Sequence, residues 1–161
     1  MFADGLTITF EGFLGLIVTV VGVWFVVQQL REAKLASQME SLLALSNQMT
    51  DLHAERIAIM EIANSKEWNE GGPDEVYAMV FDDKEIMDSY IKIGNLFDLI
   101  GTLVSSRALG MEMTNKLYGH LAPTMYRTLE KLINIDRHKE NEPNIYDNWE
   151  WLTIELEKMN A

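Results

Sequence analysis

The side chains that most often carry chemistry are few in this chain, and the histidines come first. His53, His120 and His138 are the three histidines, and they lie far apart in the sequence. None belongs to an H-E-x-x-H or E-x-x-H pattern, the spacings that place two metal ligands on one face of a helix. We therefore expect each histidine to be a surface or capping residue, and we expect neither a metal site nor a cofactor.

Nucleophilic and nucleotide chemistry is equally hard to place. The chain has no cysteine, which excludes disulfides, thiolate metal sites and cysteine nucleophiles. It has no G-x-S-x-G elbow, phosphate loop or dinucleotide fingerprint. Helical RNases of the HEPN type separate their arginine and histidine by a few residues on one helix, whereas Arg137 and His138 are adjacent. No catalytic residue is expected, and a helical hydrolase or RNase is only a third hypothesis.

An acidic segment and a group of aromatic residues can each be interpreted either as a binding site or as part of the structure. From Glu67 to Asp88 there are eight acids and one base, Lys84. Clustered carboxylates bind calcium or magnesium, but the D-x-[DN]-x-[DN]-G loop is missing, so a solvated acidic surface is preferred. Tyr126, Trp149 and Trp151 form either an aromatic binding patch or part of the core, and core packing is preferred.

Length and charge limit the function classes. The length of 161 residues fits one domain plus an anchor. The formal net charge is −12. Phosphate binding relies on clustered lysine and arginine, so this charge argues against a nucleic-acid partner. It also disfavours broad adhesion to anionic lipid heads.

The segment that must position the rest is Gly12–Leu30. It has no charged residue over nineteen positions, and its apolar part, Phe13–Val27, is interrupted only by two glycines and Thr19. A bilayer core takes about 20 mostly apolar residues in a helix, and a spanning segment must bond its backbone internally. We expect a transmembrane helix here, with the lipid bilayer as a partner. The expected parts of the chain are an extracytoplasmic N-terminus at residues 1–11, the transmembrane helix at 12–30, a helix leaving the membrane at 31–51 and a cytoplasmic helical domain at 52–161.

Two alternatives to an anchor fit the segment less well. A cleaved signal peptide needs a positive n-region and a small-residue cleavage site. Asp4 and Glu11 precede the apolar run without any lysine or arginine, and Gln28–Arg31 follows it without a small-x-small site. A helix buried in a soluble core would have more polar interruptions.

The flanking charges predict the orientation. Arg31 and Lys34 come just after the segment and acids come before it, so the positive-inside rule places the N-terminus outside the cell membrane and the main domain in the cytoplasm. Trp24, together with Arg31 and Lys34, is expected to mark the inner membrane interface.

Small residues line one face of the predicted span. They recur at helical steps of three and four, a spacing that continues beyond the span: Gly12, Gly15, Thr19, Gly22, Val26, Gln29, Ala33 and Ala36. Small residues let helix backbones approach closely in lipid, which predicts a packing face for another copy or for a different membrane subunit. The alternative is that glycine is simply common in membrane helices.

The rest of the chain reads as helical throughout, because no segment shows a sustained strand alternation. We predict an all-α fold in which the transmembrane helix continues into a cytoplasmic bundle of about five helices. A break is expected near residues 46–51, because Ser46-Asn47 and Thr50-Asp51 are residues that cap helix starts, and a loop is expected at 69–74. The predicted helices are Leu52–Asn64, Asp83–Ser106, Glu112–Tyr118, Thr124–Arg137 and Asn144–Met159.

Asp82 and Asp83 suit the start of the predicted helix Asp83–Ser106, because negative charge there meets the positive end of the helix dipole. The predicted core face of that helix is Ile86, Tyr90, Ile93, Phe97, Ile100, Leu103 and Val104, widened by Leu96 and Leu99, and its opposite side is the polar stripe Asn95, Asp98, Thr102 and Ser105.

Several of these segments resemble a known family. Tyr90–Val104 resembles the F-E-x-L-G-x-L-V helix of a prokaryotic family of uncharacterised membrane-anchored helical proteins. The anchor exit Gln28–Arg31 is similar to that family's W-Y-Q-L-R. The family's "W…R…NP..Y..FE.L" ending is resembled by Tyr126, Arg137, Asn141-Glu142-Pro143 and Tyr146–Leu152, with Trp149 in place of Phe and Glu142 inserted. The resemblance implies a membrane-anchored helical fold, but no activity, because that family is itself of unknown function.

These observations favour a non-enzymatic single-pass membrane protein. It is expected to act as a self-assembling scaffold or as an accessory subunit of a larger membrane complex. The alternative is a pore-forming or membrane-disrupting effector of the defence type, gated by its cytoplasmic domain. A looser likeness to membrane-tethered helical effectors of antiviral systems, which assemble as rings, is the basis of that alternative.

Overall fold

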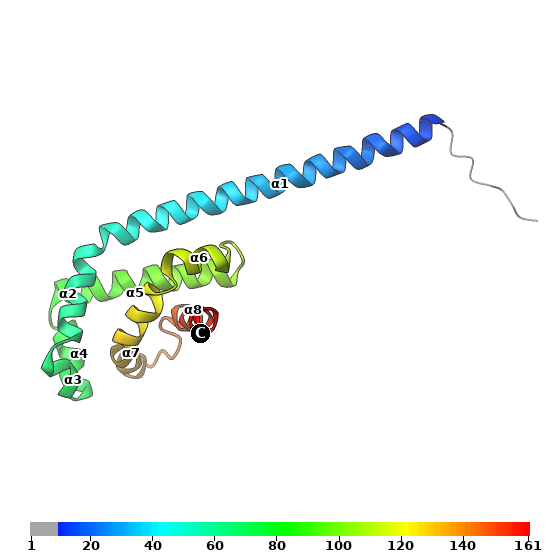
Figure 1. Cartoon of the computed structure of the whole chain (residues 1–161). Helices are drawn as coiled ribbons and strands as arrows, with labels where there is room; N and C mark the ends of the chain where they lie inside the picture. The colour runs from blue at the N-terminus through cyan, green and yellow to red at the C-terminus, as the bar shows by residue number, and fades with distance from the viewer. Residues whose placement is uncertain (1–9) are drawn as a thin grey trace, which may run out of the picture. The chain divides into compact units, whose positions relative to one another are not determined.

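The chain is helical wherever the structure describes it. The computed structural model describes the backbone of residues 10–161 and the side chains of residues 18–161. That part contains eight helices and no strand, which confirms the predicted all-α class (Figure 1). The helices are α1 (Phe10–Asp51), α2 (His53–Ala63), α3 (Lys66–Glu70), α4 (Pro73–Phe81), α5 (Lys84–Ser105), α6 (Met111–Tyr118), α7 (Leu121–Glu140) and α8 (Asp147–Asn160).

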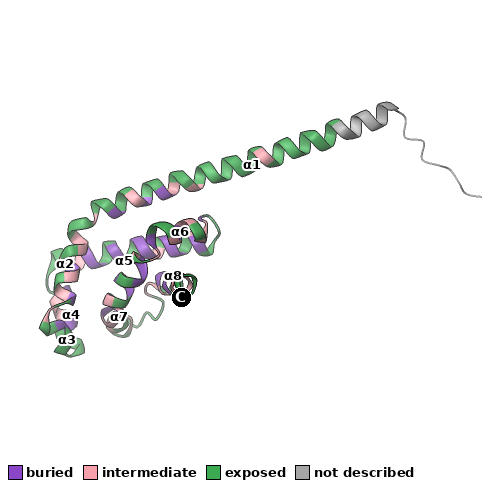
Figure 2. Ribbon diagram, in the orientation of Figure 1, coloured by how far each residue is buried: buried purple, intermediate pink, exposed green. Residues whose placement is uncertain are grey.

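Two compact units divide the chain within α1, between Met39 and Glu40. In the first unit, the described side chains are exposed from residue 18 to residue 39, apart from the partly buried Gln28 and Gln38 (Figure 2). The second unit, Glu40–Ala161, holds the hydrophobic core, to which α1 contributes the buried Leu42, Leu45 and Met49.

The predicted membrane span is only partly covered by the described residues. Among those residues, none of the helices combines the length and the apolar character needed to cross a membrane. The side chains of residues 12–17, which begin the predicted span Gly12–Leu30, lie outside the described part. The transmembrane helix therefore stays a prediction.

The expected number of about five helices in the second unit is wrong, because seven helices follow α1 in the described chain. The additional ones are α3 and α4, which occupy most of the segment predicted as a loop at 69–74. Ser65 begins α3 by accepting a hydrogen bond from the Trp68 amide at 3.1 Å. Glu75 begins α4 by accepting one from the Gly72 amide at 2.9 Å. Both helices bury so few side chains that no helical periodicity shows in the sequence.

The break expected near residues 46–51 lies at the end of that range. The Thr50 hydroxyl, expected to cap a new helix, instead donates to the Ser46 carbonyl at 3.0 Å within α1. The helix continues to Asp51, and α2 starts at His53.

Helix α5 is the centre of the second unit, where it contacts α2, α4 and α8. Asp83 caps it by accepting from the Glu85 amide at 2.9 Å and the Ile86 amide at 3.3 Å, so α5 begins within one residue of the prediction. Its buried apolar residues include most of the predicted core face: Tyr90, Ile93, Leu96, Phe97, Ile100 and Val104.

Trp149 on α8 is fully buried against α5 and α7. Its ring stacks on Phe97 with a centroid distance of 4.8 Å and meets Tyr126 edge-on at 5.4 Å. Its indole nitrogen donates to the Ala122 carbonyl at 3.1 Å. For Tyr126 and Trp149 this confirms core packing rather than an exposed aromatic patch, whereas Trp151 is 36% exposed.

Replacing this indole tests the proposed core. Trp149→Ala removes a fully buried aromatic side chain, so the free energy of unfolding should fall by about 3–5 kcal/mol. Trp151→Ala is the matched control, since it removes the same side chain from a partly exposed position and should cost well under half as much. Urea titrations followed by far-UV circular dichroism measure both. Equal losses for the two variants would contradict this description of the core.

Candidate functional site

The predicted packing face on α1 lies on an exposed surface. Its six described members are all exposed: Thr19, Gly22, Val26, Gln29, Ala33 and Ala36. A side chain placed at Gly22 would meet nothing within 4 Å. Gly12 and Gly15, the first two members of the face, lie outside the residues whose surroundings the structure describes.

The exposed apolar surface is wider than this face. The large hydrophobic side chains exposed on this part of α1 are Val18, Val20, Val21, Val23, Trp24, Phe25, Val26, Val27 and Leu30. Five of them are consecutive from residue 23 to residue 27, so they point in all directions around the helix. The predicted interface residues Trp24, Arg31 and Lys34 are exposed as well.

In the second unit, polar side chains gather where α8 begins, and Asp98 on α5 is central to them. Its Oδ1 accepts hydrogen bonds from the backbone amides of Asn148 at 3.0 Å and Trp149 at 3.2 Å. Its Oδ2 accepts from the Asn148 side-chain amide at 3.3 Å. The N-cap residue of α8, Tyr146, supplies no side-chain bond and has a left-handed backbone with φ of 57°. Asp98 therefore caps α8 from another helix, satisfying amides that a helix start leaves unpaired.

Two glycines on α5 make room for this contact. A Cβ atom at Gly94 would overlap the ring of Tyr146, and one at Gly101 would overlap the carbonyl of Asn148. Gly94, Asp98 and Gly101 follow each other at steps of four and three, so they form one face of α5. This face, the α8 seat, accepts the start of α8 at close range.

Arg137 on α7 fixes the same start from the other side. Its Nε donates to the Ile145 carbonyl at 2.8 Å, and its two terminal nitrogens pair with Asp147 at 3.1 Å and Glu150 at 2.8 Å. Burial raises the pKa of the Glu150 carboxyl, but the hydrogen bonds from Arg137 and Tyr126 outweigh it and leave that pKa below its usual value. The Arg137 guanidinium is thus fully engaged in holding α8.

Asp136, beside Arg137, is a buried carboxyl that is 7% exposed. It accepts a hydrogen bond from the Tyr90 hydroxyl at 3.0 Å. Burial raises the pKa of Asp136, the Tyr90 hydrogen bond opposes this rise, and the nearby charges of Glu140 and Glu142 add to it. Tyr90 and Asp136 line a hollow of about 440 Å³, which Asp98 and Tyr146 also line. No group of three or more His, Cys, Asp or Glu side chains among the described residues is arranged to hold a metal ion.

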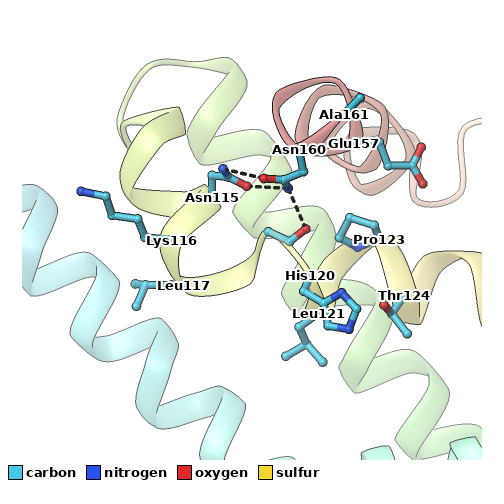
Figure 3. Close-up of a pocket in the computed structure, with 11 residues that line it drawn as sticks. Asn115, Lys116, Leu117, His120, Leu121, Pro123, Thr124, Glu157, Asn160 and Ala161 are labelled. Carbon is cyan, nitrogen blue, oxygen red and sulfur yellow. Dashed lines mark hydrogen bonds between the residues drawn. The ribbon is translucent and has the colours of Figure 1, made fainter.

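A second hollow, of about 660 Å³, lies where α6, α7 and α8 meet (Figure 3). The Asn115 and Asn160 amides bond each other there at 3.0 and 3.2 Å, and the Asn160 amide also donates to the Gly119 carbonyl at 3.3 Å. Glu157 at its edge is paired with Arg127 at 2.8 Å. These polar groups therefore bond one another and tie helix ends together. His120 also lines this hollow.

The α8 seat is the feature that the sequence-based prediction missed. The sequence pattern places Asp98 on a polar stripe opposite the core face of its helix, and it offers Arg137 only for an RNase pair and for the family resemblance. The G-x-x-x-D-x-x-G spacing of Gly94, Asp98 and Gly101 was the available signal, since small residues at helical steps mark close approach.

Comparison with known proteins places the chain in a family without assigning an activity. The family model described as Domain of unknown function (DUF4760) matches residues 14–156, so the match covers the exposed part of α1 as well as the α8 seat. Comparisons with curated proteins and with solved structures gave no significant match.

Removing the Asp98 cap should weaken the α8 seat. Asp98→Ala leaves two amides of α8 without an acceptor, and the free energy of unfolding should fall by about 1–3 kcal/mol. Hydrogen exchange of the Asn148 and Trp149 amides should accelerate more than exchange in α5. Asp82→Ala, at an exposed position, is the control and should change stability by about 0.5 kcal/mol or less. No difference between the two variants would show that Asp98 is not a cap.

The raised pKa of Asp136 predicts a pH-dependent effect of substitution. A carboxyl with a raised pKa in the folded state favours folding when protonated, and this contribution is lost as the pH rises through that pKa. Asp136→Asn mimics the protonated form and can still accept the Tyr90 hydrogen bond. The stability of the variant relative to the wild type should therefore increase from pH 4 to pH 7, measured by urea titration at each pH. A constant difference over this range would contradict the raised pKa.

Proposed function

Because the chain belongs to the DUF4760 family, whose function is unknown, we propose a function from its own residues: a non-enzymatic membrane module. In this proposal Gly12–Leu30 spans the cell membrane once, with the N-terminus outside. The domain that follows lies in the cytoplasm, and the protein acts as a self-assembling scaffold or as an accessory subunit of a larger membrane complex.

The observation that carries this proposal is the exposed apolar surface around α1. Large apolar side chains are exposed on all sides of the helix, at Val18, Val20, Val21, Val23–Val27 and Leu30. Moving each such side chain from water into an apolar phase is worth roughly 1.5–3 kcal/mol. A helix that is apolar all round belongs in a large core or in a membrane. The uncharged stretch of nineteen residues matches the length of about 20 that a bilayer requires.

Assembly is supported by the small residues on the same helix. Gly22 is exposed, and nothing lies within 4 Å of the position that its side chain would take. Helices in lipid associate through such surfaces, because packing replaces the hydrophobic effect as the driving force. The partner in this proposal is a second copy or another membrane subunit.

A binding role also agrees with how the second unit uses its polar side chains. Asp98 caps α8 and Arg137 holds the same helix through three acceptors. Both groups are thereby committed to the fold, which weakens the RNase hypothesis for Arg137 and His138. In this proposal the protein therefore acts by binding other molecules through its exposed surfaces.

The test uses the full-length chain in membranes. The protein should stay with the membrane fraction after alkaline carbonate treatment, and it should migrate as an oligomer or complex in mild detergent. Gly22→Leu should weaken that association by on the order of tenfold, because the added side chain separates the helices. Val20→Leu is the control, since it enlarges an exposed residue on the side of the helix opposite the small-residue face and should have no effect.

Three results would change the proposal. Release by carbonate would exclude the membrane span, and an unchanged size for Gly22→Leu would exclude the small-residue face as the contact. Loss of membrane potential when the protein is expressed would favour the alternative, a pore-forming or membrane-disrupting effector.

A further inference from the structure

A buried part of Arg56 on α2 lacks a hydrogen-bond partner. Its Nε atom is buried and has no acceptor among the described residues. None of the ion pairs in that part of the chain includes Arg56 either. A buried donor without an acceptor costs free energy. The chain has 25 acidic residues, yet none of those described accepts a hydrogen bond from this atom. Arg56 as a whole is only partly buried and lines a surface groove, so its guanidinium can pair with a carboxylate from outside this unit.

Arg56 borders an apolar groove between α2 and α7. The groove has a volume of about 470 Å³, and its apolar wall is formed by Ile57, Met60, Leu121 and Met125. Methionine side chains adapt readily to a bound surface. Glu61 also lines the groove and disfavours ligands with several negative charges. An apolar segment with a single carboxylate is the complementary partner.

The chain itself carries such a segment. Glu32, Leu35 and Met39 follow each other on α1 at steps of three and four, so they share one face of the helix. All three are exposed, and the apolar pair is exposed by 56% and 43%. None of the ion pairs in the described chain includes Glu32. Grooves of this type bind helices through anchors at this spacing.

We propose that the groove between α2 and α7 binds the Glu32–Met39 face of α1 from a second copy. Leu35 and Met39 fill the apolar part, and the Glu32 carboxylate pairs with the guanidinium of Arg56. The inference rests on the proposed self-assembly and identifies its cytoplasmic contact. The two surfaces differ, so the contact is heterologous and joins copies head to tail into a ring or a filament.

The absence of native cysteine allows a direct test in the full-length chain. One copy carries Leu35→Cys and a differently tagged copy carries Ile57→Cys, and the two are expressed together in membranes. Oxidation should give a disulfide-linked dimer that contains both tags. Ile154→Cys, at an exposed position on α8, which does not line the groove, replaces Ile57→Cys as the control and should give no such dimer.

Charge reversal tests the pairing of Glu32 with Arg56. Arg56→Glu and Glu32→Arg should each reduce the cross-linked dimer by on the order of tenfold, and combining both substitutions in each copy should restore it. Restoration is the decisive result, because a variant that merely misfolds would not be rescued by a change on the partner surface.

The outcomes separate this inference from the proposed function. If Gly22→Leu weakens association while the Leu35–Ile57 dimer does not form, the protein assembles but the groove contact is wrong. If the wild-type chain stays monomeric in the membrane, the proposed self-assembly and the groove contact both fail. A fatty acid that co-purifies with the wild type and is lost in Arg56→Glu, without any cross-linked dimer, would also overturn the proposal.

Discussion

The second unit depends on the contact between the Asp98 carboxylate and the first amides of α8. Helix starts leave amides unpaired, and here the acceptor comes from a neighbouring helix instead of the residue before the start. The contact is possible because Gly94 and Gly101 let the chain approach α5 closely. With α8 in this position, Trp149 is buried against Phe97. The helix cap, the close approach of the backbones and the aromatic packing therefore all occur where α8 begins, at the α8 seat.

Several polar side chains near the start of α8 are types that could take part in catalysis, but here they bond other parts of the fold. Arg137 binds the Ile145 carbonyl and two carboxylates at the start of α8, and Tyr90 bonds the buried Asp136 next to it. Buried polar groups are stable only when they are hydrogen-bonded, so a network of this kind specifies how α5, α7 and α8 fit together. These polar groups are therefore committed to holding α8 against α5 and α7.

Sequence reasoning found the long helices because each buries a periodic apolar face. It placed α5 within one residue at each end, through Asp83 as a cap and the recurring apolar residues that follow. It missed α3 and α4, since Trp68, Val76 and Val80 are too few to form a periodic pattern. It also assigned Asp98 to a polar stripe, because a cap supplied across fifty positions of sequence cannot be read from local spacing. Pairings between helices require the tertiary structure.

Electrostatics limits how copies of this chain could associate. A net charge of −12 makes copies repel one another, so association requires local contacts that outweigh a general repulsion. An apolar contact reduces the exposed hydrophobic surface of α1, but it does not by itself fix the direction or the register of one helix against its partner. In the proposed contact, the ion pair between Glu32 and Arg56 fixes both, because Arg56 lies among the residues that line the groove. In the proposed contact, this one ion pair lets an acidic chain assemble in one geometry without general aggregation.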